Sequence, residues 1–200
     1  MKTVSGLFDD YNDAKTAVDA LERSGVPSDQ ISIISNNADD RHDDHSGAAN
    51  GAGTGAGLGA VVGGAGGLLA GLGMIVIPGV GPVVAAGWLA ATAVGAVAGA
   101  VAGGAAGGLI GALIESGIPE ADAHVYAESV RRGGTLVTAK VADAVALNAE
   151  AILKHSNWVD PIERRSAYTK QGWTKFDDTL DPYEPAAIEE ERNRYRQPGV

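Results

Sequence analysis

Hydrophobic and polar residues alternate over residues 4–8 and again over residues 30–34, the period-two pattern of a strand with one packed face. Asn12 or Asp13 can cap a helix between these stretches. Small and apolar residues in this helix recur at helical spacing: Ala14, Ala17, Val18 and Leu21. Residues 1–36 are therefore predicted to form a β-α-β unit.

A second group of elements follows residue 114. A helix is predicted from Pro119-Glu120, because proline suits the first helical position, and it ends at Gly133-Gly134. Residues 135–141 alternate as a strand. A further helix from about Asp143 to His155 carries four apolar residues on one predicted face: Ala144, Leu147, Ala151 and Ile152.

Together the two groups predict a small α+β head in the order β-α-β, insertion, α-β-α, with its halves in residues 1–36 and 115–157. This order is close to a ferredoxin-like fold that lacks one strand. A three-stranded sheet leaves an edge that a second copy of the chain could cover.

The segment between the two halves is uncharged and rich in glycine. No charged residue occurs from Ser46 to Ile114, and 23 of the 29 glycines lie between Gly47 and Gly117. Glycines recur at every fourth position in two runs: Gly51, Gly55, Gly59, Gly63, Gly67 and Gly71, then Gly95, Gly99, Gly103, Gly107 and Gly111. Such rows let two helix backbones pack closely.

A turn separates the two rows, formed by Pro78, Gly79, Gly81 and Pro82. Residues 51–114 are therefore predicted to form a long glycine-zipper α-helical hairpin, with helices over Ala52–Ile77 and Val83–Ile114. The glycines are the predicted self-association contacts. Each glycine costs a helix about 0.8–1.0 kcal/mol relative to alanine, so the hairpin needs packing partners or lipid to form.

Two environments could stabilise this hairpin. Both predicted helices exceed the roughly 20 residues that cross a bilayer, and Arg41, Arg131 and Arg132 lie on the terminal side of the hairpin. This placement predicts transmembrane helices in a bacterial inner membrane with both termini in the cytoplasm, consistent with the lack of an N-terminal signal peptide. The alternative is a cytoplasmic structural protein whose hairpins pack into a large homo-oligomer or filament.

Composition narrows the chemistry. The net charge of −10 argues against nucleic acid as a partner, and the absence of cysteine excludes thiolate metal sites and cysteine nucleophiles. His42 and His45 lie in an acidic linker, residues 37–50, and are weak candidates for metal ligands because a linker lacks rigid geometry. No nucleotide-binding or hydrolase motif occurs. We expect no enzyme activity and no cofactor, and the sequence identifies no small-molecule substrate. A third hypothesis is a small-ligand or metal-binding sensor that uses the head and the acidic linker.

The C-terminal segment, residues 158–200, mixes aromatic residues with charges and prolines. Pro185 could start a short helix that places Glu190 and Arg194 at i,i+4. Two interpretations remain open: an extended tail that wraps over the head, or a docking arm for a partner.

The order of these pieces resembles the bacterial YflT-type general stress proteins. The resemblance extends over roughly residues 3–176 and rests on these motifs: Gly6-Leu7-Phe8-Asp9 with Ala14, Ala17 and Leu21; Ile31-Ser32-Ile33-Ile34; Ile77-Pro78-Gly79-Val80-Gly81-Pro82; Gly117-Ile118-Pro119-Glu120 with Tyr126; Gly134-Thr135-Leu136-Val137; Ile152-Leu153-Lys154-His155; Tyr168; and Gly172-Trp173. It implies an association with stress and a glycine-rich insertion, and it brings no catalytic residues.

Overall fold

The computed structural model of the chain describes residues 1–38, 73–92 and 108–196. Its strands are β1 (Lys2–Phe8), β2 (Ile31–Asn36), β3 (Gly73–Ile77), β4 (Gly81–Gly87) and β5 (Thr135–Val141). Its α-helices with described bounds are α1 (Tyr11–Arg23), α4 (Leu109–Glu115), α5 (Glu120–Arg131), α6 (Ala146–His155), α7 (Pro161–Lys170) and α8 (Pro185–Arg196). Residues 88–92 are also helical, and short 3₁₀ turns precede β2 and α6.

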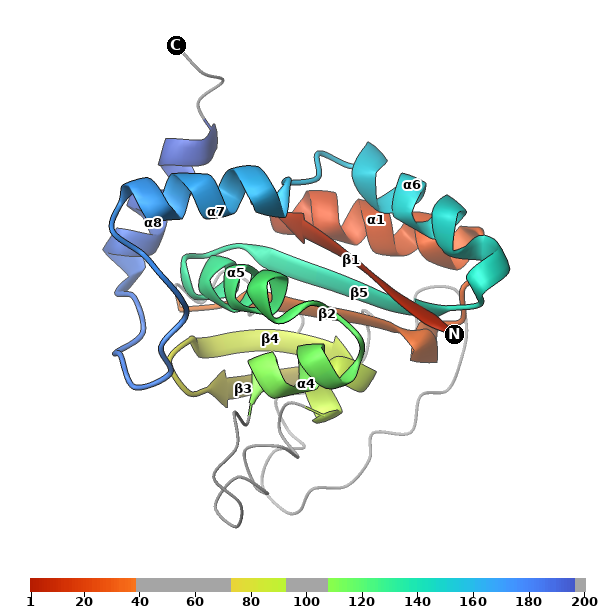
Figure 1. Cartoon of the computed structure of the whole chain (residues 1–200), viewed down its shortest axis with the longest axis horizontal. Helices are drawn as coiled ribbons and strands as arrows, with labels where there is room; N and C mark the ends of the chain where they lie inside the picture. Colours follow the sequence, from red (N-terminus) through yellow and green to blue (C-terminus); the bar gives the residue numbers. More distant parts are fainter. Residues whose placement is uncertain (39–72, 93–107, 197–200) are drawn as a thin grey trace.

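The strands form one antiparallel sheet in the order β1-β5-β2-β4-β3 (Figure 1). Strand β5 lies between β1 and β2 and is antiparallel to both, so β1 and β2 run parallel to each other with α1 as their connection. This is the split β-α-β arrangement of ferredoxin-like folds, as expected for the head. Strands β4 and β3 then extend the sheet beyond β2.

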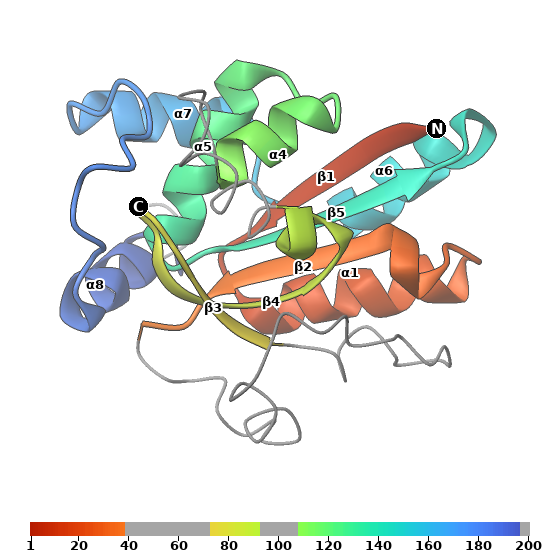
Figure 2. The same ribbon diagram turned by 90° about the horizontal axis from the view of Figure 1, so that it is seen from below.

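Helices cover both faces of the sheet (Figure 2). Helices α1 and α6 pack on one face, where Phe8, Leu21 and Val137 belong to one apolar core. Helices α4 and α5 lie on the other face, where Leu113, Tyr126 and Leu136 belong to a second core. The sheet is therefore the middle layer of three, and its alternating side chains serve two cores.

Local sequence sets the helix ends. Asp10 caps α1 by accepting a hydrogen bond from the backbone N–H of Asn12 at 2.8 Å, so the cap lies before the predicted Asn12 or Asp13. Pro119 precedes α5, and Asp160 caps α7 ahead of Pro161. Helix α8 begins at Pro185, as predicted.

The predicted glycine-zipper hairpin is wrong for residues 73–87, and most of the rest of it lies outside the described residues. Gly73–Ile77 and Gly81–Gly87 are strands β3 and β4, not the ends of two long helices. Strand formation is favoured here because residues 74–77 and 83–84 are mostly β-branched, and β4 gains a buried position beside β2. Within the predicted second helix, the described residues are helical at 88–92 and in α4, Leu109–Glu115.

Two further expectations need correction. The sheet has five strands rather than three, because the β3–β4 hairpin of the insertion adds to the β2 edge. At the opposite edge, Val159 makes a single bridge to Leu7, with a hydrogen bond of 2.8 Å from its N–H to the Leu7 carbonyl oxygen.

The second correction concerns helix α6. Its buried face is formed by Ala146, Ala149 and Leu153, whereas Leu147, which was expected on the apolar face, is 77% exposed.

Among the described helices, none combines the length and apolar character needed to span a membrane.

Candidate assembly surface at the β3–β4 edge

The turn predicted at residues 78–82 is present, but it joins two strands rather than two helices. The N–H of Val80 donates to the Ile77 carbonyl oxygen at 3.0 Å and closes the turn. Gly79 and Gly81 have φ values of +72° and +97°, in the region that favours glycine. The glycines therefore allow the tight reversal of a β-hairpin at the outer part of the sheet.

The C-terminal tail packs on this turn. A β-carbon added at Gly79 would lie 2.6 Å from the α-carbon of Asp178, and one added at Gly81 would lie 2.8 Å from Cβ of Pro182. Phe176 is 7% exposed and belongs to the core beneath α4 and α5. The turn glycines thus have a second role: they leave room for the backbone of the tail.

The tail makes a second contact through helix α8, which packs on the loop after α5. Ile188 is fully buried, and Arg192 donates from Nε to the carbonyl oxygen of Gly133 at 3.0 Å. A β-carbon at Gly133 would lie 2.5 Å from Cγ2 of Ile188. Residues 158–196 therefore wrap over the head, in agreement with the first of the two interpretations, and the docking arm for a partner stays a prediction.

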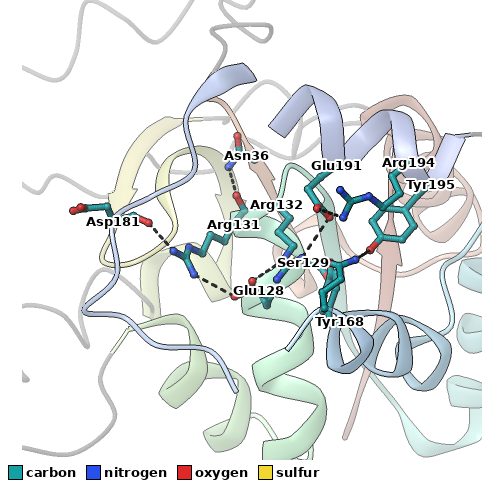
Figure 3. Close-up of polar contacts among 11 residues, drawn as sticks. Asn36, Glu128, Ser129, Arg131, Arg132, Tyr168, Asp181, Glu191, Arg194 and Tyr195 are labelled. Atoms are coloured by element: carbon teal, nitrogen blue, oxygen red, sulfur yellow. Dashed lines mark hydrogen bonds and ion pairs between the residues drawn. The ribbon is translucent and has the colours of Figure 1, made fainter. Parts of the chain in front are cut away.

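A buried ionic cluster lies between these two contacts (Figure 3). Arg132 donates from Nε to Glu128 Oε1 at 2.6 Å, and from Nη1 to Gln171 Oε1 at 2.6 Å. Its Nη1 also lies 3.5 Å from Glu191 Oε2 on α8. Glu128, Arg132 and Glu191 are each less than a tenth exposed. One guanidinium therefore links α5, the end of α7 and α8.

Arg131 extends this cluster to the tail segment before α8. Its Nη2 donates to the carbonyl oxygen of Asp181 at 2.6 Å, and its Nη1 lies 3.6 Å from Glu128 Oε2 (Figure 3). On the other side, Nδ2 of Asn36 donates to the Arg131 carbonyl oxygen at 3.4 Å. The side chain and backbone of Arg131 thus connect the tail to the end of β2.

Tyrosine rings stack on the arginines of the cluster. Arg132 lies 4.2 Å from the ring centroid of Tyr168, Arg131 lies 4.9 Å from that of Tyr183, and Arg164 lies 3.8 Å from that of Tyr195. Cation–π contacts strengthen when they are desolvated, as they are here. All three tyrosines belong to the C-terminal segment, Tyr168 in α7, Tyr195 in α8 and Tyr183 between the two helices.

Tyr168 is the centre of this stack and is fully buried. Burial raises the pKa of its hydroxyl well above the ordinary value of 10.0, although Arg164 and the hydrogen bond with Ser129 act in the opposite direction. The hydroxyl donates to Ser129 Oγ at 3.1 Å. Tyr168 therefore stays neutral at physiological pH and serves as a packing and hydrogen-bonding group.

The cluster pairs charged groups of the head with groups of the C-terminal segment. Its arginines are matched by carboxylates, carbonyl oxygens and aromatic rings of the same chain. Within the described ranges, no group of three or more histidine, aspartate or glutamate side chains is placed to hold a metal ion. The arrangement is suited to fixing the tail on the head.

The structure places only part of the predicted site. Pro78, Gly79, Gly81 and Pro82 lie together at the β3–β4 turn. Gly111 lies in α4, partly exposed, one turn from Ile114, which is 39% exposed. The other zipper glycines lie outside the described residues, as do the candidate metal ligands: Gly51, Gly55, Gly59, Gly63, Gly67, Gly71, Gly95, Gly99, Gly103 and Gly107, with His42 and His45.

Both glycine-rich segments attach to the same part of the head. Ala38 follows β2, and Gly73 begins β3, which pairs with β2 through β4. Thr92 is the last described residue of the helical segment after β4, and Gly108 precedes α4, whose Leu109 shares a core with Leu89. The described residues on either side of 39–72 and of 93–107 therefore belong to one folded body.

Sequence reasoning missed the ionic cluster and the strand character of residues 73–87. Arg131-Arg132 was interpreted only as a topological signal, and nothing in the local pattern pairs these arginines with Glu191 or Tyr195 more than 50 residues away. One local signal was present: a glycine pair directly after two arginines marks a helix end, where a second element can approach closely.

The described residues define an α+β protein with a five-stranded antiparallel sheet and a C-terminal segment packed on the head. Residues 3–75 match the family described as heat induced stress protein YflT domain. This match includes β1, α1 and β2 and ends within β3. No curated protein and no solved structure matches the chain.

Proposed function

We propose that this chain is a non-enzymatic stress protein that self-associates through its two glycine-rich segments, without crossing a bilayer. The glycines at every fourth position support close helix–helix contact between copies. The YflT match over residues 3–75 supports the association with stress. The head, on which the tail is packed, provides the folded body to which the two glycine-rich segments are attached.

One observation carries the choice between the two environments: β2 and β3 belong to the same sheet. If residues 46–72 crossed a bilayer once, β2 and β3 would lie on opposite sides of it. Two crossings need roughly 40 apolar residues, and this uncharged stretch has 27. Residues 93–107, 15 in number, are shorter than one crossing. The connectivity therefore supports a lipid-free homo-oligomer over the inner-membrane hairpin.

The test is the particle mass of the full chain in detergent-free buffer, measured by multi-angle light scattering. We expect a defined particle larger than a monomer. The double variant Gly63→Leu, Gly103→Leu places a bulky side chain in each glycine row. It should block close helix–helix contact and lower the particle mass. The matched control is Gly64→Leu with Gly104→Leu, which adds the same bulk one position out of phase.

A lipid-free monomer at micromolar concentration would contradict the proposal. So would an equal loss of assembly in the in-phase and out-of-phase variants, because bulk alone would then explain the effect. A protein that becomes soluble only with detergent would instead favour the membrane-inserted alternative.

A further inference from the structure

Strand β3 forms an open edge of the sheet. Among the described residues, no strand pairs with its outer side. Met74 is 58% exposed and Val76 is 73% exposed, although both are apolar. Natural edge strands are usually protected by charged residues, proline or a bulge; Gly73–Ile77 has no charge and no proline. This edge therefore has the character of an interface.

Pairing within the sheet fixes which backbone groups of β3 face outward. Pro82 has no N–H, and its carbonyl oxygen accepts from the N–H of Asn37, on the β2 side. In an antiparallel strand the N–H and C=O groups of one residue point to the same side, so the backbone of Pro82 forms no hydrogen bond toward β3. Val76 is opposite Pro82 in the β3–β4 ladder, and these two residues are therefore a non-hydrogen-bonded pair. By alternation, the N–H and C=O groups of Met74 and Val76 point away from β4.

We propose that β3 pairs antiparallel with β3 of a second copy of this chain, around a two-fold axis at Ile75. In this register Met74 is opposite Val76 of the partner subunit, and both residues present outward groups. The two symmetric pairs then form four backbone hydrogen bonds. Counting the described strand Gly73–Ile77, a register centred on residue 74 or 76 would form two, so the two-fold at Ile75 satisfies the most of these groups.

The exposed side chains support a second copy as the occupant. Met74 and Val76 lie on the same face of β3, because they are two residues apart. In the proposed register each covers the other across the axis, which removes four exposed apolar side chains from water. The pairing joins two five-stranded sheets into one and does not use the glycine-rich segments.

Cysteine cross-linking tests this register, because the chain has no native cysteine. At a non-hydrogen-bonded antiparallel pair the α-carbons are about 4.5 Å apart, within disulfide reach. Ile75→Cys should therefore give a disulfide dimer under mild oxidation, seen on a non-reducing gel. Met74→Cys and Val76→Cys are the controls, because each would lie two positions out of register from its own copy, beyond about 7 Å.

A charge exchange provides a second measurement that does not depend on the Ile75 variant. Met74→Lys with Val76→Lys places like charges opposite each other and should reduce the dimer to monomer. Met74→Glu with Val76→Lys places opposite charges in the same pairs and should restore it. Both are measured by light scattering in the Gly63→Leu, Gly103→Leu background, where only the β3 contact should remain.

The proposal is overturned if Ile75→Cys forms no disulfide dimer or if all three cysteine variants cross-link equally. It is also overturned if light scattering gives the same particle mass for the two charge variants. Cross-linking of Ile75→Cys that persists in the glycine variants supports the β3 contact. That result stands even if the glycine-rich segments prove not to assemble, so the two proposals can fail separately.

Discussion

Ile188 of α8 packs directly on Gly133, which lies two residues beyond the end of α5. Gly133 has a φ of +102°, and a β-carbon there would meet Cγ2 of Ile188 at 2.5 Å. At Gly133 the chain therefore turns from α5 back toward β5, and Ile188 of the tail packs on the same residue. A residue with a side chain at position 133 would strain the backbone of this turn and would collide with Ile188.

Gly133→Ala should lower the free energy of unfolding by about 1–3 kcal/mol, from backbone strain and loss of the Ile188 contact. It should also increase proteolysis between residues 171 and 184, where the tail runs to α8. Chemical denaturation and limited proteolysis measure the two effects. Gly25→Ala is the control, because Gly25 has a φ of +94° but no atom within 4 Å of an added β-carbon. Equal effects of both variants would show that the Ile188 contact is unimportant.

Gly79→Ala should detach the tail from the β3–β4 turn, because the obstructing atom is the α-carbon of Asp178 and cannot move as a flexible side chain would. Amide hydrogen exchange of residues 176–182 should become faster. Gly117→Ala, also at positive φ but with open space around it, should leave this exchange unchanged. Unchanged exchange in Gly79→Ala would mean that the turn does not hold the tail.

Arg132→Met should cost about 3 kcal/mol of stability, because it leaves the buried carboxylate of Glu128 with only the more distant Arg131. The double variant Glu128→Gln, Arg132→Met removes both charges and should recover part of the loss. Urea denaturation of the two variants checks this. A double variant less stable than Arg132→Met would contradict the assigned pairing.

Stability should fall at alkaline pH through Tyr168. Burial raises the pKa of this hydroxyl above 10.0, so in the unfolded chain it ionises first and unfolding releases a proton. The stabilisation is complete below pH about 10 and decreases above it, by up to about 1.4 kcal/mol per pH unit. Tyr168→Phe should lose about 1 kcal/mol at neutral pH with the Ser129 hydrogen bond, and should show a shallower alkaline decline. Parallel declines in the two proteins would contradict this role.

The α+β head could be predicted because its signals are local. The alternation in β1 and β5, the proline before α5 and the glycines after it each specify an element within a few residues of themselves. The split β-α-β order follows from those elements. The face of α6 was mispredicted because apolar residues lie on two sides of this helix: Ala146, Ala149 and Leu153 on one side, Leu147 and Ala151 on the other. Tertiary packing buries the first side.

The insertion was mispredicted for a different reason. The four-residue glycine spacing was extended through residues 73–87, where β-branched residues and the free edge of β2 favour strands instead. The ionic cluster depends on contacts between residues distant in sequence, such as Arg132 with Glu191. Single-sequence patterns do not encode which charges will meet across such distances.

Fractionation of the untagged, full-length protein tests the central claim most directly. Lysate is separated into membrane, small soluble and large-particle pools, and the membrane pool is extracted with alkaline carbonate. The proposed assembly predicts a large particle without lipid, with any membrane-associated protein released by carbonate. Protein that stays with the membrane after carbonate, or that occurs only as a small soluble monomer, would contradict it.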